Sequence, residues 1–440
     1  MSSYPVVGVL ELILRAMAGL FSIGFTLVGF WLVMTLVYLQ YRRVSSLEAQ
    51  TLGAEKRSPL VRTMVSLVAG VLGGILGSFI YILLGASIGE MGLGFIWIVA
   101  LSLAVFNLRL ICFAYAGGIV SLSALVLGWP RVDIPAIMSL VGVLHLVESV
   151  LILAMGHLDT TPVLIPGPGG RPRGVCLLQK FWPIPVVVGM MVSLPLAEMP
   201  PEVLHMPDWW PLVKPSLPTP EGMEAIFAVI AVTAATGYGD FTYTRTPRQK
   251  ATLTACASAV FSLVLLGLAV LSASVPAVRW AAALFSPLGH EAVIFLARRV
   301  EQTGTPLFDP VPSGLRVLDV LPGSPASAAG IKAGDIILSV NCQPISTIPE
   351  FLQGLSAVPY AALLEVESTS RVQSRARRGL GDASLGGTRT VQIKIRGKDS
   401  ELGLVFVPRE GPVRMVRLGS GGLAAMISRW LGRRLWGGRS

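Results

Sequence analysis

Residues 314–341 read GLRVLDVLPGSPASAAGIKAGDIILSVN, and this stretch determines the fold expected for the C-terminal part of the chain. Apolar residues alternate along Leu315–Val320, which predicts a half-buried strand. Pro322-Gly323 predicts a turn, residues 325–329 predict a short helix that stops at a glycine, and Ile336–Val340 predicts a second strand. The order of strand, turn, helix and strand predicts a small α+β unit.

The sequence beyond this stretch continues the same unit. Thr347–Leu355 has apolar residues at helical spacing, and Ala361–Glu367 and Thr390–Arg396 predict two further strands. Between these strands, Ser368–Gly387 is rich in Arg, Ser and Gly and predicts a solvated hairpin insertion.

From Ser313 to Pro408 this order of elements resembles a bacterial-type PDZ domain. The resemblance implies that a protein partner adds a peptide to the sheet as an extra strand, while backbone amides of a nearby loop hold a C-terminal carboxylate. It places the loop at residues 312–315 and the receiving strand at Leu315–Val320. The loop reads Ser-Gly-Leu-Arg where animal domains have Gly-Leu-Gly-Phe, and the alternative is a groove filled by a segment of the chain itself. The resemblance implies these peptide-binding residues: Ser313, Gly314, Leu315, Arg316, Val317, Ile348, Phe351, Leu352 and Leu355.

The rest of the chain is too apolar for a soluble protein. Of its 440 residues, 53% are hydrophobic and 14% are charged, and the mean hydropathy is +0.69, which indicates a membrane protein. The four cysteines form no Cys-x-x-Cys pair, so no disulfide framework or zinc knuckle is expected. The net charge of +10 comes mainly from arginines in short loops and in the tail, which indicates anionic lipid and not nucleic acid as the partner.

About eight apolar runs predict membrane-spanning helices, so we expect a polytopic α-helical membrane protein with a C-terminal PDZ-like unit. One run, Met223–Thr236, is shorter than the roughly 20 residues that a span needs, so it either crosses with help from the residues after it or is re-entrant. The mixed segment Trp280–Ala297 is either an interfacial helix or a ninth span. The expected spans are Met17–Leu39, Thr63–Ala86, Leu93–Phe106, Leu110–Leu127, Ile134–Met155, Pro183–Ala197, Met223–Thr236 and Ala251–Ser274.

Two polar or small-residue patterns lie within these runs. Gly70 and Gly74 have the small-xxx-small spacing that lets helices approach closely, and we expect packing within the chain rather than dimerisation. His145 and Glu148 lie three residues apart on one helical face. This spacing predicts a structural pair, with a proton relay as the alternative.

The stretch Ala234-Ala-Thr-Gly-Tyr-Gly-Asp240 is similar to a potassium-channel selectivity filter. A filter needs stacked carbonyl groups from four subunits after a pore helix. However, Ala235 occupies the position of the filter's hydroxyl-bearing threonine, and Arg245, Arg248 and Lys250 would repel a cation. We therefore expect a polar turn that ends a short helix, with an ion channel or transporter as the less favoured alternative.

The sequence does not contain the catalytic motifs of the zinc or serine proteases that often accompany PDZ domains. A zinc intramembrane protease needs His-Glu-x-x-His on one helix, whereas His290-Glu291 has no second histidine after it. Gly419-Ser420-Gly421-Gly422 imitates a serine nucleophile loop, but it lies in the basic tail with no domain around it. We expect no catalytic residue, no metal site and no cofactor, and the alternative is a relative or a regulator of a membrane protease.

Seven short stretches spread along the chain form a second set of motifs. They are Tyr38-Leu-Gln-Tyr-Arg-Arg43, Cys112-Phe-Ala-Tyr-Ala-Gly-Gly118, Gly128-Trp-Pro130, His145-Leu-Val-Glu148, Gln179-Lys-Phe-Trp-Pro183, Tyr238-Gly-Asp240 and Pro287-Leu-Gly-His-Glu291. Together they resemble the multi-span PDZ membrane proteins of Gram-positive bacteria. The resemblance implies a non-enzymatic adaptor in cell-division site selection, which links a curvature-sensing polar scaffold protein to the Min inhibitor of division-ring assembly.

The distribution of charges predicts the side on which each loop lies. Basic loops at residues 42–62, 171–180 and 245–250 are expected inside the cell, and residues 198–214, acidic on balance, outside. Eight crossings would leave the PDZ-like unit outside. A ninth crossing at Trp280–Ala297, or a re-entrant segment before it, places this unit in the cytoplasm below a bacterial plasma membrane, as we expect.

These patterns divide the chain into three parts. Residues 1–300 form the transmembrane part, residues 305–409 the PDZ-like unit, and residues 410–440 a basic tail. The arginines and tryptophans of the tail suit an anionic membrane surface, with a solvated tail as an equal alternative.

Overall fold

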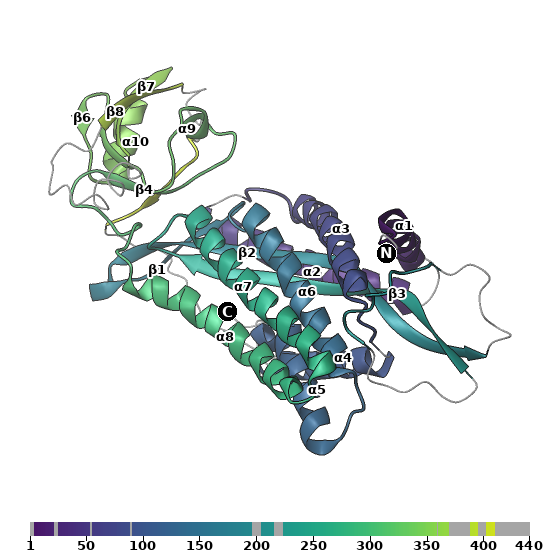
Figure 1. Ribbon diagram of the computed structural model, residues 1–440. Coiled ribbons are helices and arrows are strands. Elements are labelled where there is room, and N and C mark those ends of the chain that lie inside the picture. The colour runs from purple at the N-terminus through teal and green to yellow at the C-terminus, as the bar shows by residue number, and fades with distance from the viewer. Residues whose placement is uncertain are drawn as a thin grey trace, which may run out of the picture.

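Two long antiparallel strands, β2 (Pro172–Pro195) and β3 (Met223–Thr242), run through the N-terminal part of the computed structural model (Figure 1). A short strand, β1 (Thr161–Pro166), pairs with the beginning of β2 and completes a sheet of three strands. The structure describes residues 4–21, 25–52, 55–88, 90–195, 204–214, 223–358, 360–368, 388–394 and 402–409.

Helices surround this sheet. Among the described residues, α3, α6, α7 and α8 are long and apolar enough to cross a membrane, and α5 and residues 92–103 are shorter apolar helices. The helices of this part are α1 (Val6–Ala18), α2 (Phe25–Leu52), α3 (Pro59–Leu84), α4 (Glu90–Phe106), α5 (Phe113–Leu127), α6 (Ile134–Met155), α7 (Pro247–Ser274) and α8 (Val278–Thr303), with 3-10 turns at Gly19–Phe21, Leu108–Ile111 and Pro168–Gly170.

Three of the expected spans were wrong. Met17–Leu39 is divided between the end of α1, the 3-10 turn Gly19–Phe21 and α2. Pro183–Ala197 and Met223–Thr236 are not helical in the described residues. They belong to strands β2 and β3. The apolar composition suited either structure, but Pro183 and Pro185 lack the N–H that a helix interior needs, and β-branched residues favour strands. The expected count of about eight spans is therefore not confirmed, while the segment Trp280–Ala297 lies within a helix long enough to cross.

The filter-like stretch also lies in an extended strand. In β3, Tyr238 pairs with Lys180 of β2, and Gly239 pairs with Gln179. The Tyr238 side chain is buried, and residues 223–236, which had the length of a pore helix, belong to the same strand. Both the filter interpretation and the expected polar turn are wrong for this segment, because its backbone is paired in a sheet.

Helix α3 packs against both the sheet and another helix through its glycines. A Cβ atom at Gly70 or Gly74 would lie 1.9 Å from a carbonyl oxygen of β2, that of Pro183 or Pro185. The expected packing within the chain thus joins the helix to a strand and not to a second helix. On another side of α3, Gly73 and Gly77 face the side chain of Val147 on α6.

Side chains satisfy part of the β2 backbone on the side where, among the described residues, no strand pairs with it. The Val187 N–H donates to the Ser78 hydroxyl of α3 at 2.7 Å, and the Phe181 N–H donates to the Tyr41 hydroxyl of α2 at 3.1 Å. Unsatisfied backbone groups cost several kcal/mol in an apolar layer, roughly the value of a full hydrogen bond there. These bonds allow an open strand to lie among the helices.

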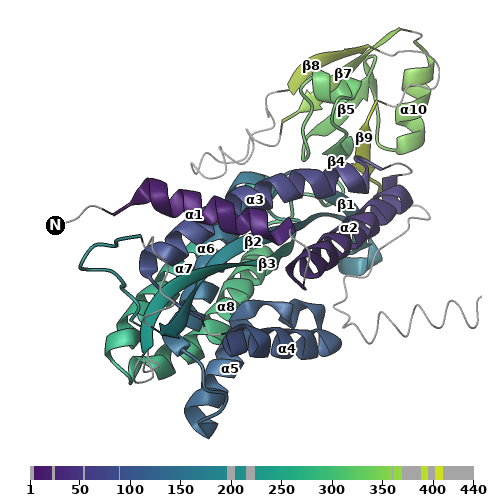
Figure 2. The ribbon, with the colours of Figure 1, turned by 90° about the vertical axis from the view of Figure 1, so that its right-hand side faces the viewer.

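The C-terminal unit lies at one end of the helices and has its own core (Figures 1 and 2). Its sheet has the order β8-β7-β5-β4-β9, with β6 paired to β5. The element positions expected from the sequence are confirmed for four strands and two helices, and β6 and β9 were not expected. The elements are β4 (Leu315–Val320), α9 (Pro325–Ala328), β5 (Ile336–Val340), β6 (Gln343–Pro344), α10 (Ile348–Ser356), β7 (Ala361–Glu367), β8 (Thr388–Lys394) and β9 (Leu404–Val407).

Candidate peptide-binding site

Strand β4, which was expected to receive a peptide, lies inside the sheet. Antiparallel partners occupy both of its sides, since Leu315 pairs with Ile337 of β5 and Val317 pairs with Phe406 of β9. A strand with both edges paired has no free row of N–H and C=O groups for a further strand. The position beside β4 that a peptide was expected to take is occupied by β9.

The residues that lead into β4 have structural contacts. Gly314 has a φ of +81°, and a Cβ atom there would lie 2.6 Å from the carbonyl oxygen of Ile337, so this turn requires glycine. The side chains of Leu315 and Val317 are buried in the core of the unit. Among these expected site residues, Ser313 keeps an exposed side chain.

Arg316 ties β4 to neighbouring loops. Its guanidinium donates to the carbonyl oxygen of Gly334 at 3.0 Å and to that of Asp309 at 3.3 Å. Burial lowers the pKa of this guanidinium from its ordinary value. These contacts assign Arg316 a structural role in the described residues.

Strand β9 forms an edge of the sheet beside α10. Within the described part of the chain, no strand pairs with its outer side. The Phe406 ring of β9 contacts the Phe351 ring of α10 edge-to-face, with 4.9 Å between the ring centroids. Leu404 and Phe406 pack against the core of the unit, while Val405 and Val407 pack on the opposite face. We call this strand, together with the helix face beside it, the β9 edge.

Helix α10 contributes the apolar face of the β9 edge. Phe351 is buried in the core, Ile348 and Leu355 are partly buried, and the side chain of Leu352 is 58% exposed. The four expected helix residues are thus brought together beside β9. Leu352 is the exposed apolar member of this set.

A capping box fixes the start of α10. The Glu350 N–H donates to the Thr347 hydroxyl, and the Glu350 carboxylate accepts from the backbone N–H of Ser346 at 2.6 Å. The hydrogen bonds that the carboxylate accepts, first from Ser346 and then from Thr347, lower the pKa of Glu350. The helix therefore presents its apolar face in a fixed register.

The β9 edge was missed in the sequence, although a signal was present. Residues 402–406 read Leu-Gly-Leu-Val-Phe, and Gly403 has a φ of +73° immediately before the strand. This Leu-Gly-Leu turn is nearer to the Gly-Leu-Gly-Phe loop of animal PDZ domains than the loop before β4. A strand of four residues at the end of the unit could not be assigned a partner from local sequence.

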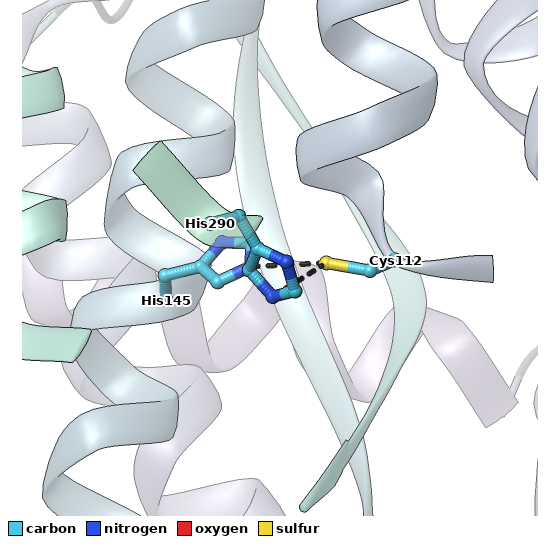
Figure 3. Close-up of side chains that lie close together, drawn as sticks. All are labelled: Cys112, His145 and His290. Carbon is cyan, nitrogen blue, oxygen red and sulfur yellow. Dashed lines mark hydrogen bonds between the residues drawn. The ribbon is translucent and has the colours of Figure 1, made fainter. Parts of the chain in front are cut away.

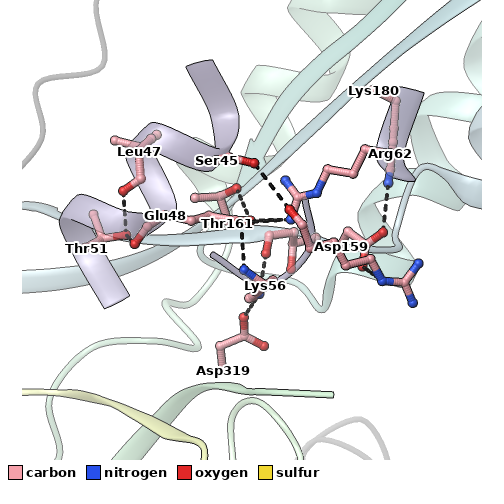
Figure 4. A network of polar contacts seen from close by, with 12 residues as sticks. Ser45, Leu47, Glu48, Thr51, Lys56, Arg62, Asp159, Thr161, Lys180 and Asp319 are labelled. Atoms are coloured by element: carbon pink, nitrogen blue, oxygen red, sulfur yellow. Dashed lines mark hydrogen bonds and ion pairs between the residues drawn. The ribbon is translucent and has the colours of Figure 1, made fainter. Parts of the chain in front are cut away.

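Polar contacts hold the C-terminal unit on the membrane part (Figure 4). Lys56, in the loop between α2 and α3, pairs with Asp319 of β4, and both side chains are largely buried. The Arg173 guanidinium of β2 donates two hydrogen bonds to Asp309, at 2.6 and 2.8 Å, which raises the pKa of Arg173. An apolar cluster lies between the parts: Cys176, Leu307, Phe308, Leu318 and Val407.

A buried network supports this junction. The Glu48 carboxylate accepts two bonds from the Arg62 guanidinium, at 2.9 and 2.8 Å, and one from the Thr161 hydroxyl at 3.1 Å. It also accepts the backbone N–H of Lys56 at 3.3 Å. The loop that carries Lys56 is thus fixed by α2, α3 and β1.

The C-terminal unit matches a known domain family. Residues 316–366 match the PDZ domain. The chain carries this PDZ domain behind apolar helices that are long enough to span a membrane. The match covers β4, α10 and the strands between and beside them, while β9 lies beyond it.

Two proteins are similar to the chain. The cell division topological determinant MinJ of Bacillus subtilis (strain 168) is 25% identical over 299 residues, which cover 65% of this chain and 65% of MinJ. The chain therefore spans less than two thirds of the length of this relative. A probable serine protease do-like of Buchnera aphidicola subsp. Acyrthosiphon pisum (strain APS) is 45% identical over 53 residues, 12% of this chain and 11% of that protein. A match of this length is shorter than a catalytic domain.

Proposed function

We propose that this chain is a membrane-anchored adaptor that recruits a protein partner through the β9 edge of its PDZ domain. The observation that carries the proposal is the position of β9, whose outer side has no partner strand among the described residues and lies beside the exposed Leu352 of α10. An added strand would gain backbone hydrogen bonds from β9, and its side chains would gain apolar contacts from α10. The occupant is thus an extended peptide segment of another protein.

We place this adaptor in the selection of the cell-division site. The support is the similarity to MinJ, whose name describes a topological determinant of cell division. The adaptor is proposed to act by binding and not by catalysis, because the name of MinJ describes a topological determinant and the similarity to the probable serine protease covers only 12% of this chain. Division-site proteins are the proposed partners, and nucleic acid is not among them.

The PDZ domain is proposed to lie in the cytoplasm, below the plasma membrane. Three basic segments expected inside the cell reach the PDZ end of the structure. Lys56 pairs with Asp319, Arg173 pairs with Asp309, and the carbonyl group of Tyr243, two residues before Arg245, accepts the Leu307 N–H at 2.6 Å. By the positive-inside rule, the domain shares the side of these cations.

The opposite end of α3 supports the same orientation. Trp210 Nε1 donates to the carbonyl oxygen of Ile82 at 2.8 Å, and the Val213 N–H donates to that of Leu84 at 2.9 Å. The segment 204–214, expected outside, therefore lies a full helix length from Lys56. A helix of 26 residues is about 39 Å long, enough to cross the apolar layer.

Anionic lipid is proposed as a second partner, through the basic tail at residues 410–440. The tail lies outside the described residues, so the proposal rests on its composition. The boundaries of the three parts of the chain, at residues 1–300, 305–409 and 410–440, also remain predictions.

Fluorescent fusions of this protein, expressed in the cells in which it naturally occurs, test the proposed function. The wild-type fusion should concentrate at division sites, and deletion of the chain should misplace septa. Leu352→Arg should disperse the fusion along the membrane, because a guanidinium replaces the exposed apolar contact of the β9 edge. Leu363→Arg is the matched control, since this leucine is 44% exposed on β7 of the same domain.

Two results would contradict the proposal. If Leu352→Arg concentrates at division sites as the wild type does, the β9 edge does not recruit the partner. If deletion leaves septum position unchanged, the division role fails even where peptide binding persists.

A further inference from the structure

Three side chains from separate helices meet within the membrane part: Cys112, His145 and His290 (Figure 3). Cys112 immediately precedes α5, His145 lies in the middle of α6, and His290 lies in the middle of α8. The Cys112 Sγ atom is 3.1 Å from His145 Nε2 and 3.6 Å from His290 Nε2. The three candidate ligand atoms all lie within 4.8 Å of one another.

The orientation of His145 is fixed from behind. Its Nδ1 atom lies 2.8 Å from the carbonyl oxygen of Val141, which can only accept a hydrogen bond. Nδ1 therefore carries the proton, and the lone pair of Nε2 points toward Cys112. A histidine whose second nitrogen donates to a backbone carbonyl is the usual arrangement of a metal ligand.

The spacing of the three atoms fits a tetrahedral zinc site. With Zn–S near about 2.3 Å and Zn–N near about 2.0 Å, tetrahedral angles place sulfur and nitrogen roughly 3.5 Å apart. The observed distances of 3.1 and 3.6 Å lie on either side of this value.

Hydrogen bonds alone do not satisfy this cluster. The Cys112 thiol has one proton, which it can donate to His145 Nε2, and its sulfur can then accept only a weak hydrogen bond from His290 Nε2–H, which leaves His290 Nδ1 as a bare acceptor. The Nδ1 atom of His290 is buried and has no hydrogen-bond partner among the described residues. Polar groups left unsatisfied among membrane helices are costly and mark functional positions. A cation that accepts one lone pair from each residue uses all three facing atoms at once.

We propose that Cys112, His145 and His290 form a Zn²⁺ site that joins α5, α6 and α8. The ligands are the Cys112 thiolate and the Nε2 atoms of the two histidines, and water takes the fourth position. The thiol proton passes to solvent when the metal binds. One thiolate and two imidazoles are ligands that Zn²⁺ prefers, whereas Mg²⁺ and Ca²⁺ prefer oxygen.

The neighbouring acid has another partner. The Glu291 carboxylate accepts the Tyr115 hydroxyl at 2.8 Å, so it is not counted among the ligands. The sequence predicted a structural pair of His145 and Glu148. However, the ring nitrogens of His145 face Cys112 Sγ and the carbonyl oxygen of Val141. The site was missed because its ligands lie on three separate segments, without the His-x-x-x-His spacing of one helix.

The metal content of the full-length protein, purified in detergent without chelators, tests the proposal. Mass spectrometry of the metals should find about one zinc per chain. Cys112→Ser, His145→Ala and His290→Ala should each lower this content at least about fivefold, because two remaining ligands hold Zn²⁺ poorly. Cys256→Ser and His205→Ala, which change exposed residues, should keep the wild-type content.

Cobalt substitution supplies a second readout that depends on the sulfur ligand. Wild-type protein stripped of metal and incubated with Co²⁺ should show a thiolate-to-cobalt charge-transfer band in the near ultraviolet, absent in Cys112→Ser. Serine keeps the helix start that Cys112 provides, so this variant should fold. Wild-type protein that holds no more zinc than Cys112→Ser, before and after incubation with Zn²⁺, and that shows no such band, would overturn the proposal. This result does not depend on the folding of the histidine variants.

Discussion

Lys56 forms an ion pair with Asp319, which lies 263 positions later in the chain. The first residue belongs to the loop before α3, and the second to strand β4 of the PDZ domain. Their side chains are 3% and 14% exposed. The pair therefore fixes the PDZ domain to the end of the membrane part that carries Lys56. A flexible tether alone would leave the orientation of the domain free.

Removal of one partner of this pair should destabilise the junction. Asp319→Asn leaves the Lys56 cation buried beside neutral acceptors, the new amide oxygen and the carbonyl oxygen of Thr160, which should lower the free energy of unfolding by about 3 kcal/mol. The double variant with Lys56→Met should cost less than the sum of the single changes by at least about 1 kcal/mol. Pulse proteolysis at increasing denaturant measures each value.

The surface pair Glu11 and Arg15 is the control for this cycle. Its side chains are 59% and 77% exposed, so Glu11→Gln should change stability by less than about 1 kcal/mol. Additive effects of the two junction changes would show that Lys56 and Asp319 do not interact in solution.

Gly70→Ala should weaken the contact between α3 and β2. The added methyl group would overlap the carbonyl oxygen of Pro183, and backbone atoms on both sides leave no flexible side chain to move, so the expected cost is at least about 2 kcal/mol. Gly267→Ala is the matched helix control, because no atom of the described residues outside its own helix backbone lies within 4 Å of its Cβ position. This control should be neutral or stabilising by up to about 1 kcal/mol.

Thermal unfolding in detergent, followed by tryptophan fluorescence, compares the two glycine variants. Equal unfolding temperatures would mean that α3 does not pack on the β2 backbone.

The sequence predicted the PDZ domain far better than the membrane part. Alternation in Leu315–Val320 and turn residues such as Pro322-Gly323 act locally, so local sequence sufficed for β4, α9 and β5. The partners of a strand are set by residues far away, and β4 was therefore taken as an edge although β9 pairs with it. The expected helix residues lie beside β9, whereas Leu315 and Val317 of the expected strand lie in the core.

In the membrane part, apolar composition could not distinguish helices from strands. Ile134–Met155 was predicted with its exact limits, because a long apolar run bounded by Asp133 and Gly156 has helix signals at both ends. Residues 183–195 have the same apolarity, but Pro183 and Pro185 were signals of extended structure. The Cys112, His145 and His290 cluster depends on how three helices pack, which no local pattern contains.

Leu352→Arg should weaken peptide binding to the purified full-length protein by at least about tenfold, close to 1.4 kcal/mol. The peptide is the tightest-binding one that this protein selects from a display library of peptides with free C-termini. Fluorescence anisotropy measures its affinity. Leu363→Arg should bind as the wild type does. Hydrogen exchange should slow at residues 404–407 when the peptide binds, since an added strand protects the backbone of β9. Protection confined to other strands would place the peptide elsewhere.

The side of the membrane on which the PDZ domain lies tests the account most directly. Cys342 is exposed in this domain, and Asp208→Cys would report on the opposite end. In a Cys256→Ser background, a membrane-impermeant maleimide should label Asp208→Cys in intact cells and should label Cys342 only after lysis, with Cys342→Ser as the blank. Labelling of Cys342 in intact cells would place the PDZ domain outside and contradict the cytoplasmic adaptor.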